Sequence, residues 1–208
     1  MSAYARPIAA PHPTTLADAL VPHLQGSAAR SALRALALVI AGALVTAAAA
    51  QLSVRLPWSP VPYTGQTAAV LLVGTVLGLR LGVASMALYV LAGIAGAPVF
   101  SAGAHGIAQL LGYTGGYLVG FILAAGLVGT LAERRWDRGA ASSAGLMIAG
   151  NLVIYLVGVP VLAAVTGMSL ADAAWNGAGV FLPWDALKIA LAAGLLPIAW
   201  RMVGFGVT

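Results

Sequence analysis

The sequence has no cysteine, which excludes disulfide bonds, thiolate catalysis and metal sites built on cysteine. Charged residues are also scarce: Asp, Glu, Lys and Arg together make up 7% of its 208 residues, and Lys188 is the single lysine. Apolar residues account for 61% of the chain, and the mean hydropathy is +0.98. Soluble domains of this length carry more charge, so the composition indicates an integral membrane protein. The apolar runs are continuous rather than alternating, which favours spanning helices over a β-barrel.

Several functional motifs are missing as well. The sequence contains no Gly-x-x-x-x-Gly-Lys-Ser/Thr, so the chain cannot hold ATP in a P-loop. The net charge of +5 does not indicate nucleic-acid binding, because the arginines are scattered beside apolar segments and form no stripe with interleaved aromatics. No inverted repeat is obvious, which weakens the case for a classical secondary transporter. Any transport must therefore draw its energy from a partner or from an ion gradient, or proceed without an energy source.

Six apolar segments are each near the roughly 20 residues that a membrane-spanning helix needs. They cover residues 33–52, 61–79, 81–97, 107–132, 144–166 and 180–202. We therefore predict an all-α membrane protein with six transmembrane helices, formed by residues 31–208 as one domain. Residues 1–30 form a Pro-containing arm that is expected to be solvated. Within it, residues 14–24 can form a short interfacial helix broken at Pro22.

The arginines orient these segments. With six crossings, the arginines that flank the segments fall on one side, and among the loops only Arg55 falls on the other. The positive-inside rule then puts both termini in the cytoplasm. The residues on the cytoplasmic side are Arg30, Arg34, Arg80, Arg134, Arg135, Arg138 and Arg201.

Two ionisable residues interrupt the last segment. Asp185 and Lys188 are three residues apart in an otherwise apolar stretch, a spacing that places both on one face of a helix. An isolated ion pair in an apolar environment costs desolvation and seldom stabilises, so a purely structural role is the weaker interpretation. Ionisable groups in a spanning helix usually mark a functional site. The pair therefore predicts a pocket for a small polar ligand, loaded from outside and carried across the bilayer.

Other residues are candidates to line the same pocket. Residues 62–66 precede an apolar run that is too short to span, so they are expected to dip into the protein as irregular backbone. Asn151 and Tyr155 lie one turn apart on a helix face, where an interhelical hydrogen bond and pocket lining are equally good interpretations. For Tyr117 the alternative to pocket lining is an interfacial anchor. A similar balance holds for Gln66 and Tyr63.

His105 is a lone histidine in a loop of small residues, with no carboxylate or second histidine nearby in the sequence. A metal needs more ligands than this, so we predict no metal site and treat ligand contact as the alternative to a plain loop residue.

Small residues recur at four-residue spacing, as at Gly74, Gly78 and Gly82, and allow helix backbones to approach closely. Internal packing is the favoured interpretation of this spacing. Docking to the helices of a partner is the alternative, and the alanine-rich first segment is the better candidate for it. Its four-residue repeats are Ala37 with Ala41, and Ala43 with Ala47.

Four stretches make the chain similar to a known family. They read PVPYTGQTAAVLLVGTVLGLRLG, LYVLAGIAGAPVFSAGAHG, GYTGGYLVGF and FLPWDALK. Through them, residues 34–197 resemble the BioY family, the biotin-binding S components of energy-coupling factor (ECF) vitamin transporters. The chain departs from the family pattern in having Tyr before the Thr-Gly-Gly turn, where Pro is usual, and Trp before Asp185, where Gly is usual.

The resemblance implies high-affinity biotin binding and import across the cytoplasmic membrane of a bacterium, without enzymatic activity or a cofactor. It also implies two kinds of partner, a transmembrane T component and ATP-binding subunits. Asp185 and Lys188 would bind the polar head of biotin, and the alanine face of the first helix would dock the T component. Further ligand contacts are expected from Asn151, Tyr155, Tyr117, Phe100, Ser101, Gly103, His105 and Gln66. A lid is expected from Pro62, Tyr63, Thr64 and Gly65.

Two other functions stay open from the residues alone. One is a self-sufficient carrier that needs no ATPase partners. The other, less well supported, is a small intramembrane hydrolase that uses Ser101 or Ser169, although neither serine lies in a nucleophile motif.

Overall fold

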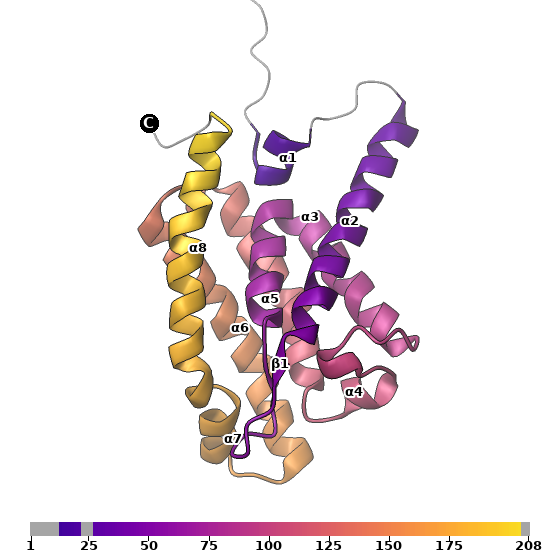
Figure 1. Ribbon diagram of the computed structural model, residues 1–208, viewed down its shortest axis with the longest axis vertical. Coiled ribbons are helices and arrows are strands. Elements are labelled where there is room, and N and C mark those ends of the chain that lie inside the picture. Colours follow the sequence, from indigo (N-terminus) through magenta and orange to yellow (C-terminus); the bar gives the residue numbers. More distant parts are fainter. Residues whose placement is uncertain (1–12, 22–26, 205–208) are drawn as a thin grey trace, which may run out of the picture.

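A computed structural model describes residues 13–21 and 27–204 of the chain as a bundle of helices with one short strand pair (Figure 1). Within these residues, five helical stretches are long and apolar enough to cross a membrane, which confirms the all-α prediction. The elements are α1 (Leu16–Leu20), α2 (Ala28–Gln51), β1 (Ser53–Val54), β2 (Tyr63–Thr64), α3 (Gln66–Ile94), α4 (Ile107–Leu111), α5 (Gly115–Glu133), α6 (Ala140–Thr166), α7 (Leu170–Gly177) and α8 (Leu182–Met202). Single turns of 3-10 helix lie at Ser101–Gly103, Trp136–Arg138 and Gly179–Phe181.

The helix α3 folds back on itself at Gly78. This residue leaves helical geometry with φ 78° and ψ −179°, a conformation that suits glycine. A Cβ atom on Gly82 would lie 2.9 Å from the Cα atom of Gly74, although eight residues of continuous helix rise about 12 Å. The chain therefore reverses here without a loop. The predicted segments 61–79 and 81–97 are the two arms of α3, which is why five long stretches are found where six were predicted.

Close backbone approach explains the glycine spacing along α3. A Cβ atom on Gly74 would lie 2.8 Å from the Cα atom of Ala125 in α5, and one on Gly129 would lie 2.5 Å from the backbone of Leu79. No larger residue fits at these contacts. The internal-packing interpretation therefore holds for Gly74 and Gly82, the two residues whose backbones meet across the hairpin.

Two helix boundaries differ from the prediction. The segment 107–132 is not continuous, because the chain leaves helical geometry at Gly112 and the long helix starts only at Gly115. The short helix α7 was not predicted. Its N-cap Ser169 accepts a hydrogen bond from the backbone N–H of Asp172 at 3.1 Å, so the sequence did contain a capping signal.

The expectation of irregular backbone at residues 62–66 is wrong for Gln66, which is the first residue of α3, and for Tyr63 and Thr64. These two residues pair antiparallel with Ser53 and Val54, with Ser53 opposite Thr64. The N–H of Gly65 extends the pairing by donating to the carbonyl of Leu52 at 3.1 Å. Pairing satisfies backbone groups that irregular backbone would have to expose to water or to other partners.

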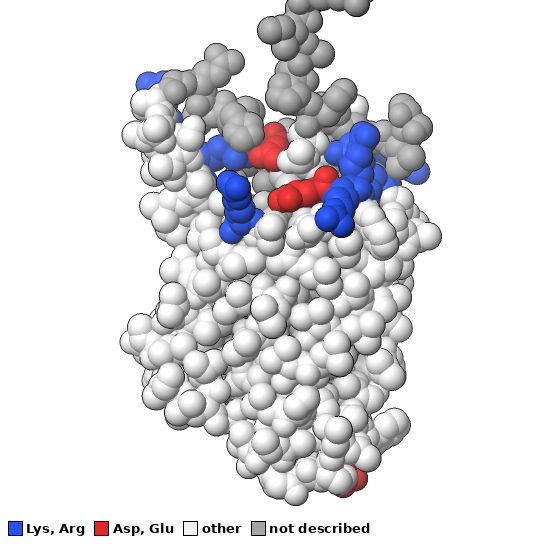
Figure 2. Space-filling view, turned by 180° about the vertical axis from the view of Figure 1, so that it is seen from behind, with Lys and Arg blue, Asp and Glu red and all other residues white. Residues whose placement is uncertain are grey.

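Charged side chains gather at one end of the molecule. Figure 2 shows them at the end that carries α1, while most of the same face is free of charge. The opposite end carries α7, as Figure 1 shows. This distribution matches a bundle that crosses a bilayer with its charges held at one surface.

The helix α1 is fastened across the charged end. Thr15 caps it, and Leu16 and Ala17 are buried, each with 3% of its surface exposed. The arm is therefore not solvated at residues 15–17, which corrects the prediction, whereas a short helix in this part of the arm is confirmed. Pro22, which was expected to end that helix, lies outside the described residues.

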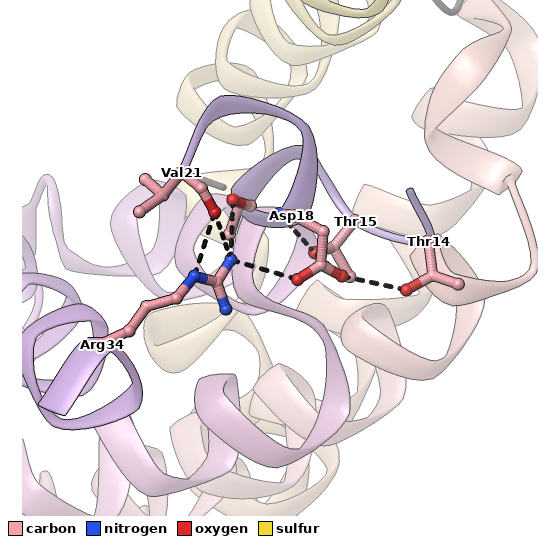
Figure 3. A network of polar contacts seen from close by, with 6 residues as sticks. Thr14, Thr15, Asp18, Val21 and Arg34 are labelled. Atoms are coloured by element: carbon pink, nitrogen blue, oxygen red, sulfur yellow. Dashed lines mark hydrogen bonds and ion pairs between the residues drawn. The ribbon is translucent and has the colours of Figure 1, made fainter. Parts of the chain in front are cut away.

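Arg34 of α2 holds α1 in place (Figure 3). Its guanidinium donates to the carbonyls of Ala17 at 3.0 Å and Val21 at 2.8 Å, and it pairs with the Asp18 carboxylate at 3.2 Å. Burial raises the pKa of Asp18, but hydrogen bonds from Thr15 and Thr14 and the charge of Arg34 outweigh burial, so this pKa lies below its ordinary value. The carboxylate is thus stabilised in its charged form.

A second polar cluster closes the same end. The indole N–H of Trp200 donates to Asp137 at 2.6 Å, and the Arg138 guanidinium lies 3.9 Å from the centre of the Trp200 ring. Arg138 also donates to the carbonyl of Pro13 at 2.9 Å. Burial raises the pKa of Asp137 in spite of its bond from Trp200. The cluster joins the end of α8, the 3-10 turn before α6 and the segment before α1.

We predict that Arg34→Ala releases α1. The change leaves the carbonyls of Ala17 and Val21 without their charged donor, which should cost about 1–3 kcal/mol of stability. Thermal unfolding in mild detergent, followed by tryptophan fluorescence, together with protease sensitivity within α1, measures this effect.

The matched control is Arg80→Ala, which removes one exposed arginine near the same end. It should leave both readouts close to those of the unchanged protein. Equal behaviour of the two variants would show that Arg34 does not hold α1.

Candidate functional site

A cavity of about 310 Å³ lies between the connection from α2 to α3 and the helices α5, α6 and α8. This volume is within the range of small-molecule sites. Its walls mix hydroxyl, amide and charged groups with aromatic rings. The lining residues are Arg55, Leu56, Ser59, Pro60, Val61, Pro62, Thr64, Gln66, Thr67, Phe100, Ser101, Ala104, Gln109, Tyr113, Thr114, Tyr117, Leu118, Phe121, Tyr155, Gly177, Phe181, Asp185 and Lys188.

Asp185 and Lys188 contribute to the wall from the first turns of α8. Pro183 lies at the start of this helix, where it needs no backbone donor, and an acidic residue in the first turn suits the helix dipole. The Lys188 ammonium lies 3.3 Å from the Asp185 carboxylate, and Asp185 is only 3% exposed. The two side chains therefore lie together inside the protein at the cavity, as predicted for a pocket.

The lysine has two further acceptors on α3 and the strand before it. Its ammonium donates to the Thr67 hydroxyl at 2.7 Å and to the Thr64 carbonyl at 3.3 Å. All three donors of the ammonium thus have an acceptor. Lys188 thereby joins α8 to β2 and to the start of α3.

Two tyrosines complete the polar part of the wall. The Tyr155 hydroxyl of α6 donates to the Asp185 carboxylate. The Tyr117 hydroxyl of α5 donates to the carbonyl of Gly177 at 2.9 Å, where α7 ends. Both rings line the cavity, so four helices converge on its polar end.

Gln66, the first residue of α3, and Phe100, in the loop after α3, form the part of the cavity wall next to this helix. The amide N–H of Gln66 donates to the Tyr89 hydroxyl at 2.7 Å, and this hydroxyl donates to the carbonyl of Val99 at 3.1 Å. Phe100 is 3% exposed and meets the Tyr89 ring edge to face, with the ring centres 5.5 Å apart. Both residues are thus fixed by Tyr89, which itself does not line the cavity.

The connection from β1 to β2 covers the cavity and is fastened at several points. The Ser59 hydroxyl donates to the carbonyl of Asn176 at 2.7 Å, and the Ser53 and Ser101 hydroxyl oxygens are 2.6 Å apart. Tyr63 stacks on Phe181 with ring centres 4.4 Å apart and donates to the Val180 carbonyl. Burial and the Asp185 charge raise the pKa of Tyr63, which keeps its hydroxyl a donor.

Several predicted contacts lie outside the cavity wall. Asn151 is buried one turn from Tyr155, and its side-chain oxygen has no hydrogen-bond partner among the described residues. His105 is exposed, with its ring 3.1 Å from the carbonyl of Gly103, and the neighbouring Ala104 lines the cavity in its place. Tyr63 and Gly65, which were predicted as lid residues, line a second pocket together with Trp184 instead.

The predicted docking alanines divide into two faces of α2. Ala37 and Ala41 are exposed, whereas Ala43 is buried and Ala47 packs in part against the core.

Some lining residues were missed at the level of the sequence. For Thr67 the sequence did contain a signal of pocket lining: a buried ammonium has three donors, Asp185 alone cannot satisfy them, and Lys188 therefore needs further acceptors nearby. Arg55 had one too, as the single arginine predicted on the outer side. Gln109, Tyr113 and Phe121 had none, because the break at Gly112 that sets their directions was not foreseen. Among the described residues no group of His, Asp and Glu is placed to hold a metal ion.

Comparisons with known proteins agree with this architecture. The family model described as "BioY family" matches residues 22–205. The chain belongs to the BioY family. It is 35% identical over 147 residues to "Biotin transporter BioY" of Rhizobium etli, and the aligned region covers 67% of this chain and 78% of that protein. It is 39% identical over 160 residues to "Probable biotin transporter BioY" of Pyrococcus horikoshii, covering 77% and 90%.

The fold of this BioY chain has been seen before. A crystal structure of the S component for biotin from an ECF-type ABC transporter superposes with a TM-score of 0.73, at 20% identity, over 85% of this chain and 95% of that one. The resemblance stated from the sequence is thus confirmed for the family and the fold. The chain is a multi-pass membrane protein of a transporter family, not an enzyme. The Ser101 hydroxyl oxygen lies 2.6 Å from that of Ser53, and Ser169 caps α7.

We predict that Thr67→Val destabilises this BioY chain while Thr67→Ser does not. Valine keeps the shape of threonine but removes the hydroxyl that accepts from Lys188, and leaving a buried charged donor short of one acceptor should cost about 1–3 kcal/mol. Thermal unfolding of the two variants in the same detergent measures the difference.

A suitable control is Thr130→Val, because the Thr130 hydroxyl donates only to its own helix, to the Gly126 carbonyl at 2.8 Å. Equal unfolding temperatures for Thr67→Val and Thr67→Ser would contradict the structural role given to this hydrogen bond.

Proposed function

We propose that this chain binds biotin in the cavity and imports it as the substrate-specific S component of an ECF transporter. The observation that carries the proposal is the buried pair of Asp185 and Lys188 at the cavity, in a chain of the BioY family. Relatives named as biotin transporters and a fold neighbour named as an S component for biotin support both parts.

The chemistry of the cavity suits biotin. The ureido ring carries two N–H donors and a carbonyl acceptor. The Asp185 carboxylate accepts from the N–H groups, and the carbonyl accepts from Tyr155 or Tyr117 once that hydroxyl gives up its present acceptor, Asp185 or Gly177. The apolar thioether ring packs against Phe100, Leu118, Phe121 and Phe181. Gln66 and Ser101 complete the proposed set of contacts.

In this proposal the membrane topology has six crossings. Each arm of α3 counts as one, because the chain reverses at Gly78. Residues 31–208 form the substrate-binding domain, and residues 1–30 form an N-terminal arm on the charged side. The positive-inside rule puts that side, and with it both termini, in the cytoplasm of a bacterium. The lid connection from β1 to β2 then faces outward.

The T component docks on the exposed face of α2. Ala37 and Ala41 are exposed there, one turn apart, and their small side chains permit close approach of a second helix. Ala43 and Ala47 serve internal packing in this assignment. ATP-binding subunits supply the energy, because this chain has no P-loop. Biotin uptake into liposomes with and without these partners distinguishes this arrangement from a self-sufficient carrier.

The proposal predicts that Asp185→Asn weakens biotin binding strongly. Asparagine keeps the shape but replaces the charged acceptor of the ureido N–H groups with a neutral amide, and a hydrogen bond to a charged group is worth about 1.5–3 kcal/mol. The dissociation constant should therefore rise on the order of 10- to 100-fold, measured with labelled biotin at equilibrium.

Asp172→Asn is the control, because Asp172 is an exposed carboxylate on α7. It should bind biotin like the unchanged protein. Undiminished binding by a folded Asp185→Asn variant, with its fold checked by gel filtration, would refute the site assignment.

The lid assignment predicts that a disulfide between positions 53 and 101 stops biotin exchange. The two hydroxyl oxygens are 2.6 Å apart, and the chain has no cysteine to interfere, so Ser53→Cys with Ser101→Cys can form a single cross-link. Release of labelled biotin should stop after oxidation and resume after reduction.

Each single cysteine variant serves as a control and should release biotin at the normal rate under both conditions. Normal release from the oxidised double variant, with the cross-link verified by mass spectrometry, would show that biotin leaves by another route.

A further inference from the structure

Arg55 is a charged residue of the cavity for which the contacts described above give no role. It lies in the lid connection, one residue after β1, and its side chain is exposed while it lines the cavity. Asp185, in contrast, is 3% exposed. Arg55 therefore stands at the mouth of the cavity, and the Asp185 and Lys188 pair lies at its closed end.

The charges of the cavity do not balance. Its charged lining residues are Arg55, Asp185 and Lys188. Lys188 is engaged by Asp185, Thr67 and Thr64, so this pair is close to neutral as a unit. Within residues 13–21 and 27–204, no carboxylate lies within ion-pair distance of Arg55. The mouth thus presents a guanidinium whose charge the protein does not neutralise.

We infer that Arg55 is a specificity-determining residue that selects ligands with an anionic outer end. A guanidinium binds a carboxylate through parallel N–H donors, a geometry that a neutral amide cannot match. A ligand with its polar head at Asp185 and a carboxylate at the end of a flexible chain directs that carboxylate toward the mouth. This inference rests on the proposed function, since biotin is such a ligand.

The position of Arg55 also affects how fast the ligand arrives. A cation at an exposed mouth attracts an anion from solution, and salt screens this attraction. Arg55 therefore contributes to the association rate as well as to the affinity, and its contribution falls at high ionic strength. A lipid phosphate at the membrane surface is the other anion that an outer arginine can contact.

The test compares biotin with biotinamide, which keeps the ring and the chain but has a neutral end. The unchanged protein should prefer biotin about 2- to 5-fold, the range of exposed ion pairs. Arg55→Gln should bind biotinamide as before and lose this preference, and Arg55→Lys should keep part of it. The biotin association rate should fall in Arg55→Gln and lose its salt dependence.

Arg80→Gln, an exposed arginine at the other end, is the control and should keep the preference. If Arg55→Gln prefers biotin over biotinamide as much as the unchanged protein does, this inference is overturned and the proposed function is not. Equal loss of binding of both ligands also overturns the inference, because it indicates that Arg55 contacts lipid or supports folding. Failure of the unchanged protein to bind biotin overturns the proposed function and this inference with it.

Discussion

The Lys188 ammonium and its three acceptors set the geometry of the cavity. A charge in an apolar environment is tolerated only with partners, and here they come from α8 itself, from the start of α3 and from the strand before it. One side chain therefore fixes where α3 begins relative to α8. The strand pair is held at the same place, because Thr64 belongs both to it and to the acceptors of Lys188.

Polar contacts also hold the two ends of the helix bundle, on either side of the Lys188 contacts. At the charged end, Arg34 and Arg138 hold backbone carbonyls before and within α1, so that the segment is bound to α2 on one side and to the 3-10 turn before α6 on the other. At the other end, Ser59 binds the carbonyl of Asn176 near the end of α7, and Tyr63 binds the carbonyl of Val180 before α8. Among these contacts, a hydrogen bond between neutral groups is worth about 0.5–1.5 kcal/mol and one to a charged group about 1.5–3 kcal/mol.

The sequence was enough for the class of fold and the centre of the site. Apolar runs and arginine positions determine the long helices, and the Asp185 and Lys188 spacing depends only on helical periodicity. Contacts that depend on chain direction could not be predicted. The reversal at Gly78 requires a positive φ that no neighbouring residue signals, and His105 lies exposed in a loop where Ala102 and Gly103 also have positive φ. The strand pair was missed because two residues are too few to show alternation.

The first arm of α3 is short for its task. From Gln66 to the reversal at Gly78 it has twelve residues, about 18 Å of rise, whereas the hydrocarbon layer is about 30 Å thick. Arg80 and Glu133 beside the reversal keep that end at the membrane surface. A solute held at Gln66 therefore lies about 18 Å from the charged end, roughly three fifths of the hydrocarbon thickness. The distance from such a solute to the charged end is thus shorter than the thickness of the hydrocarbon layer.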